Sequence, residues 1–108
     1  MQTESRQLWI GLVEVRPLVG KNEILGDAKG AFVNIVTWAT DRTEYRRNAE
    51  LVIGDLGLFV AELVNADPVH VRRKTGFEEE IEEIIARAQD NPNAIIYGIF
   101  HTFERDDA

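Results

Sequence analysis

The sequence contains no cysteine and only two histidines, His70 and His101. The lack of cysteine excludes disulfide bonds, thiolate nucleophiles, zinc-thiolate sites and iron–sulfur clusters. Two histidines this far apart in the chain do not by themselves indicate a metal site, so we expect neither a metal nor a cofactor. A chain without disulfides suits the reducing cytosol, and we therefore expect a cytoplasmic protein.

Basic residues are also few, because 12 lysines and arginines stand against 19 acidic residues and leave a formal charge of −7. A field of this sign repels nucleic acid and anionic membranes. No run approaches the ~18 apolar residues of a membrane-spanning helix, and Met1–Arg6 lacks the pattern of a signal peptide. We expect no nucleic-acid or membrane partner, whereas a basic protein partner is favoured.

Sequence motifs that are typical of many enzymes are also missing. No glycine-rich loop is followed by Lys-Ser or Lys-Thr, and neither a nucleophile elbow nor a His-Glu-x-x-His sequence is present. Gly54 and Gly57 end a predicted helix, whereas the glycines of a dinucleotide-binding fingerprint open one. These absences lean against catalysis without excluding an enzyme of another kind.

The length and composition of the chain predict one compact domain over residues 1–108. A chain of 108 residues with 44% hydrophobic residues can bury roughly two-thirds of its unfolded surface, which is enough for a core without metals or disulfides. The polar ends, residues 1–6 and 105–108, are expected to fray.

Alternating apolar residues predict two strands at the start of the chain, Leu8–Val15 and Ala31–Ala39. These strands are expected to pair antiparallel. The connection between them, Leu18–Gly30, is longer than an ordinary hairpin turn and carries apolar residues. We interpret this segment either as a binding loop or as a plain long loop.

A helix is predicted to follow, because Asp41 and Glu44 have the spacing of a capping box and Gly57 suits a left-handed helix end. A strand over Leu58–Val64 comes next. Val69–Lys74 alternates in polarity and can extend that edge, and a second helix is predicted over about 77–89.

The last apolar stretch, Ala94–Phe103, is expected to form the central strand, because its alternate residues are apolar on both faces. The predicted order is β-β-α-β-α-β, with parallel pairs joined by helical crossovers. We therefore expect an α+β two-layer sandwich, in which a mixed four-stranded sheet carries two helices on one face.

Such a fold leaves the other sheet face without cover, and an apolar face of that size usually marks an interface. We expect this face to present Trp9, Phe32, Trp38 and Phe100. The leading hypothesis is a small non-catalytic domain that acts through protein–protein contact. It would be a homodimer, or an acidic inhibitor or immunity-type protein that binds a basic partner.

The alternative is a small enzyme or small-molecule binder with a site at the open sheet face. His101 lies at a strand end and can serve as a general base, while Glu14 and Glu62 are charges inside apolar strands. Two carboxylates brought together can raise the pKa of one of them. The simpler interpretations are a histidine that bonds the backbone or fills an interface, and two glutamates that face solvent or pair with an arginine.

Overall fold

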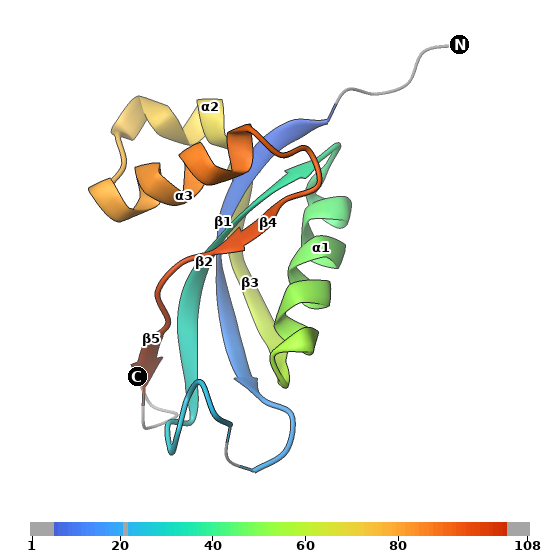
Figure 1. The fold of residues 1–108 in the computed structure, drawn as a ribbon, viewed down its shortest axis with the longest axis vertical. Coiled ribbons are helices and arrows are strands. Elements are labelled where there is room, and N and C mark those ends of the chain that lie inside the picture. The colour runs from blue at the N-terminus through green and yellow to red at the C-terminus, as the bar shows by residue number, and fades with distance from the viewer. Residues whose placement is uncertain (1–5, 21, 104–108) are drawn as a thin grey trace.

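The structure, a computed structural model, describes residues 6–20 and 22–103 and confirms the predicted α+β class (Figure 1). Most of the ends that were expected to fray, residues 1–5 and 105–108, lie outside the described residues. In chain order the elements are β1 (Gln7–Pro17), β2 (Gly30–Ala39), α1 (Arg42–Asp55), β3 (Leu58–Pro68), α2 (Val69–Arg72), a 3-10 turn η1 (Arg73–Thr75), α3 (Glu79–Gln89), β4 (Ile95–Tyr97) and β5 (His101–Phe103).

Every strand pair of the five-stranded sheet is antiparallel. The strand order is β3-β1-β2-β4, and β5 also pairs with β2. The predicted mixed sheet with parallel neighbours is therefore wrong. The reason is that β1 lies between β2 and β3, so these two strands run in the same direction without becoming neighbours.

The stretch predicted as one central strand, Ala94–Phe103, lies instead at the edge of the sheet beside β2. It is divided into β4 and β5, although the Gly98 N–H still donates to the Asn34 carbonyl oxygen at 2.9 Å. Both of its faces are apolar because Ile95 packs into the core on one side of the sheet and Ile96 into the core on the other. Apolar residues on both faces thus reflect helices on both sides, and not a central position.

One sheet face is covered by α1, and we call it the α1 face. It carries Val13 of β1 and Val33 and Ile35 of β2, all of which are fully buried. The helix contributes Tyr45 and Ile53 to the same core. The predicted helix is confirmed, and its N-cap is Asp41, whose side chain accepts a hydrogen bond from the Glu44 N–H.

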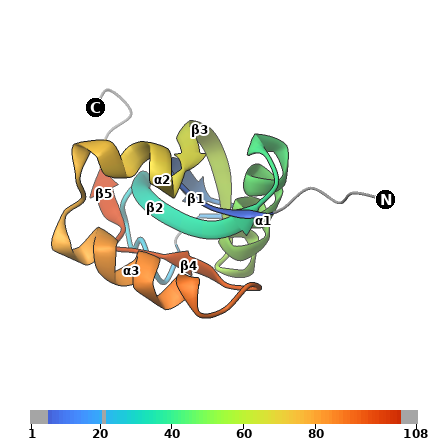
Figure 2. The same ribbon diagram turned by 90° about the horizontal axis from the view of Figure 1, so that it is seen from above.

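The opposite face is covered by α2 and α3, and we call it the α3 face. Ile10 and Val36 are buried there against Val69 of α2 and Ile85 of α3. Figure 2 shows α1 on one side of the sheet and α3 on the other. The prediction of two layers with both helices on one face is therefore wrong, because strands that are apolar on both faces need a helix on each. Among the described residues, no helix is long and apolar enough to cross a membrane.

Candidate functional site

The helices on the α3 face cover only part of it. Figure 1 shows α2 and α3 near one end of β1 and β2, while the other end of these strands extends past them together with β5. The uncovered residues, which we call the open strip, are each half-buried or exposed. By strand register they are Leu12, Glu14, Arg16, Phe32, Asn34, Phe59, Glu62, His101 and Phe103.

Two phenylalanines and an arginine occupy the middle of the open strip. The ring centroids of Phe32 and Phe103 are 5.4 Å apart. The guanidinium of Arg16 lies 5.2 Å from the Phe103 centroid and forms an ion pair of 2.9 Å with Glu14. Gly30 makes room for this cluster, since a Cβ there would lie 2.7 Å from the Phe103 ring. The ring stack is thus held in place while remaining partly open to solvent.

Glu62 and His101 lie at the two ends of one row that crosses the strip. Strand register places Glu62 opposite Glu14, Glu14 opposite Phe32, and Phe32 opposite His101. Opposite residues on antiparallel neighbours point to the same face. The row therefore runs from an acidic end on β3, through an aromatic centre, to a histidine on β5.

This geometry does not bring the suggested catalytic groups together. Phe32 lies between His101 and Glu14, and Glu62 is one strand further away. Neighbouring strands are about 4.8 Å apart, so His101 is separated from Glu14 by two such steps. The two glutamates do face each other, but Glu14 is held by Arg16. Among the described residues, no group of three or more histidine, aspartate or glutamate side chains is placed to hold a metal ion.

The four aromatic residues expected at an interface do not share one surface. Only Phe32 lies on the open strip. Trp9 packs on the α1 face beside Tyr45, with ring centroids 6.3 Å apart, and its buried Nε1 has no hydrogen-bond partner among the described residues. Trp38 lies under α3, and Phe100 packs against the core of the α1 face. An interface role for these last three residues stays a prediction.

The long connection between β1 and β2 packs away from the open strip. The side chain of Asn22 donates hydrogen bonds to the carbonyl oxygens of Leu56 and Gly57 at the end of α1. Leu25 is buried in the core of the α1 face. Val19 remains 84% exposed. As a binding loop, this segment would serve the α1 side of the molecule and not His101 or the two glutamates.

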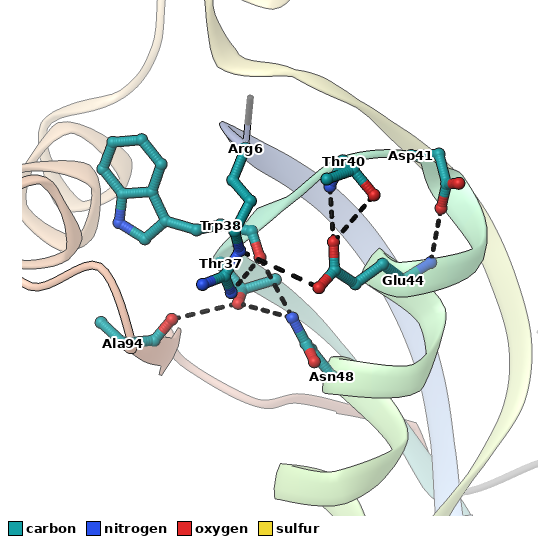
Figure 3. Close-up of polar contacts among 8 residues, drawn as sticks. All are labelled: Arg6, Thr37, Trp38, Thr40, Asp41, Glu44, Asn48 and Ala94. Carbon is teal, nitrogen blue, oxygen red and sulfur yellow. Dashed lines mark hydrogen bonds and ion pairs between the residues drawn. The ribbon is translucent and has the colours of Figure 1, made fainter. Parts of the chain in front are cut away.

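A polar network fixes the end of β2 where it meets α1 and β4 (Figure 3). The buried Thr37 hydroxyl donates to the Ala94 carbonyl at 3.0 Å and accepts from the Asn48 side chain at 3.2 Å. Asn48 and Arg6 both donate to the Trp38 carbonyl oxygen, each at 3.1 Å. Sequence reasoning missed this network, and its only signal was a threonine inside an apolar strand.

Sequence reasoning also missed three members of the open strip. Arg16 lies beyond the predicted end of the first strand, and no face was assigned to Phe59. Strict alternation along Ala94–Phe103 would place Phe103 on the same face as Ile95, but Phe103 lies on the face of Ile96. The cause is the irregular segment between β4 and β5, which interrupts the alternation of the strand.

Comparisons with known proteins add no relative: no family model, no curated protein and no solved structure matches this chain.

Proposed function

We propose that this protein is a non-catalytic domain that acts through protein–protein contact, with a second copy of itself packed on the open strip. The observation that carries the proposal is the partly exposed cluster of Phe32, Phe103 and Arg16 on a sheet face without a helix over it. Aromatic residues and arginine are enriched at interfaces and often dominate their binding energy. A self-complementary patch is what a two-fold dimer requires.

The order of residues across the strip supports a second copy as the partner. When two strips pack face to face about a two-fold axis parallel to the strands, the order of the row is reversed in the second copy. Glu62 of one copy then faces His101 of the other, and Glu14 of one copy faces Phe32 of the other. A two-fold axis across the strands would place Glu62 opposite Glu62, which like-charge repulsion disfavours.

Replacement of the central phenylalanine tests this interface. Phe32→Glu places a charge in the aromatic centre and should weaken the dimer by about 2 kcal/mol, the scale of an interface hot spot, which is about a 30-fold rise in Kd. The matched control is Val19→Glu, because Val19 is 84% exposed and lies outside the strip. Sedimentation velocity measures the association, and circular dichroism verifies the fold of each variant.

Charge exchange tests the orientation of the two copies. Glu62→Lys alone removes the carboxylate that His101 faces, and His101→Glu alone places two carboxylates opposite one another, so each should weaken the dimer. The double variant places opposite charges in both symmetry-related contacts and should recover association. A wild-type chain that sediments as a monomer, or a Phe32→Glu variant that associates as tightly as wild type, would contradict the proposed function.

A second candidate is an acidic inhibitor-type protein that binds a basic partner. The observation that favours it is an acidic surface on α3, formed by the four glutamates Glu79, Glu80, Glu82 and Glu83. Added salt separates the two candidates. Screening weakens the attraction between an acidic surface and a basic partner, whereas two copies that each carry a charge of −7 repel one another and lose that repulsion in salt.

A further inference from the structure

A hollow lies at the end of the sheet where β1 starts and β2 ends, opposite the open strip. It has a volume of 350 Å³, which is within the range of small-molecule sites. We call it the Trp38 pocket. It is formed by the starts of β1 and α2, the end of β2, the turn η1 and the end of α3, and its lining residues are Arg6, Gln7, Leu8, Trp38, Val69, His70, Arg73 and Gln89.

The pocket combines an apolar floor with a basic rim. Leu8 and Val69 are buried, and the Trp38 ring packs with them in the core of the α3 face. The lining residues that can carry a charge are Arg6, His70 and Arg73, and no carboxylate among the described residues lines the pocket. In a chain with 19 acidic residues against 12 basic ones, this lining favours an anionic ligand over a cationic one.

Arg73 is positioned in advance to receive an anion. Its Nη1 donates to both carboxylate oxygens of Glu82, at 2.8 and 2.7 Å, and its guanidinium lies 5.6 Å from the Phe77 ring centroid. These contacts hold the side chain, while the hydrogen bonds to Glu82 use only one of its three nitrogens. The planar guanidinium suits two-point recognition of a carboxylate. The neighbouring rim residue, His70, is exposed and can turn its imidazole toward the same anion.

We propose that the Trp38 pocket binds a small organic carboxylate with one aromatic ring or a branched aliphatic group. The apolar group lies against Trp38 and Leu8, and the carboxylate is bound by Arg73 and His70 at the rim. The volume of the pocket limits the ligand to about the size of a substituted single ring. This inference is independent of the proposed dimer, because the pocket and the open strip share no residue.

The two tryptophans provide an internal control for a binding test. Trp38 lines the pocket, and its Nε1–H donates to the Ala88 carbonyl at 2.8 Å, so its indole N–H signal responds to changes at the end of α3. Trp9 lies on the opposite face of the sheet, and Trp9→Phe assigns the two signals. In two-dimensional ¹H–¹⁵N NMR spectra, titration with phenylacetate or isovalerate should shift the Trp38 signal saturably and leave the Trp9 signal unchanged.

Matched ligands and variants test the role of the charge. Phenylacetamide has the shape of phenylacetate without its charge and should bind at least about tenfold more weakly, as expected for a lost charge-assisted hydrogen bond. Arg73→Gln and His70→Gln should each weaken phenylacetate binding by a similar factor. The control Arg47→Gln, on the exposed side of α1, should not. The proposal is overturned if neither carboxylate gives a saturable Trp38 shift, if phenylacetamide binds as tightly as phenylacetate, or if both rim variants bind like wild type.

Discussion

Replacement of Gly11 by alanine is the small change from which we expect the largest loss of stability. Gly11 lies on β1 and faces α1. A Cβ at this position would be 2.7 Å from the Tyr45 Oη and 2.9 Å from its Cζ, and it would also press against the Asn65 carbonyl oxygen. Real Cβ atoms essentially never approach other atoms so closely, so both β3 and the ring of Tyr45 must move, or β1 itself must shift.

The expected cost follows from what the added methyl group displaces. Overpacking of a dense core costs about 1–3 kcal/mol. The Tyr45 hydroxyl, in a fully buried side chain, donates to the Ile35 carbonyl at 2.7 Å, and breaking this bond adds about 1–3 kcal/mol. Alanine has less conformational entropy than glycine in the unfolded chain, and this difference offsets about 0.5–1 kcal/mol of the loss. We therefore expect a loss of about 3 kcal/mol, which lowers the Tm of a domain this small by more than about 10 °C.

Urea unfolding followed by circular dichroism measures this loss. The matched control is Gly54→Ala, because Gly54 lies in α1 and an added Cβ there would have nothing within 4 Å, so the same substitution should stabilise by up to about 1 kcal/mol. In a double-mutant cycle, Tyr45→Phe should relieve part of the clash and give a non-additive result. A Gly11→Ala variant within about 0.5 kcal/mol of wild type, or an additive cycle, would refute the reasoning.

Two further predictions concern polar groups at the end of β2. Thr37→Val should cost about 1–3 kcal/mol in urea unfolding, because it leaves the Ala94 carbonyl and one donor of Asn48 without their partner; a variant as stable as wild type contradicts the buried network. The backbone N–H of Thr40 bonds the Glu44 carboxylate and holds the pKa of this side chain below its ordinary value of 4.5. A lowered pKa stabilises the folded state above the ordinary value and loses that effect as the pH falls through the lowered one. The stability advantage of wild type over Glu44→Gln should therefore shrink below about pH 4.5, and a constant difference through that range would rule the effect out.

Local structure was predictable where a short-range signal decides it. The spacing of Asp41 and Glu44 predicted the start of α1, and the Glu44 N–H does donate to Asp41 Oδ1 at 2.8 Å. In a capping box the Glu44 carboxylate would in turn accept from the backbone N–H of the N-cap residue, Asp41. Here it accepts from the N–H of Thr40 instead. Alternation likewise predicted β1 and β2 as strands. These features depend on residues within a few positions of one another, so one sequence suffices.

The placement of the helices could not be predicted in the same way. Both faces of β1 and β2 are apolar, so either face can receive an amphipathic helix. The choice depends on whether Val69–Arg72 continues β3 or turns onto the sheet, and its alternating sequence permits both. In the structure it forms α2, and Val69 packs beside Ile10 and Ile85 on the α3 face. A four-residue helix has too little sequence to reveal this periodicity.

The candidate surfaces depend on long-range strand register and were therefore even harder to predict from the sequence. Phe103 and Phe32 meet only because Gly98–Phe100 interrupts the alternation before β5. The single glycine, Gly98, is the one local feature of the sequence that indicates such a shift. The Trp38 pocket brings together residues from five separate segments, and its shape requires α2 to be helical. Sequence periodicity predicted which residues belong to strands and helices, but it could not predict which of them lie side by side in the fold.

The open strip has one physical cause, which is a helical layer shorter than the strands beneath it. The 11 residues of α3 span about 16 Å, whereas the 10 residues of β2 span about 33 Å. Even fully aligned with the strand, α3 can cover only half of it. The open strip is the uncovered end of β2, and the Trp38 pocket lies at the end where α2 turns onto the sheet. Because they lie at opposite ends of the same strands, a carboxylate in the pocket and a second copy on the strip can be bound at the same time.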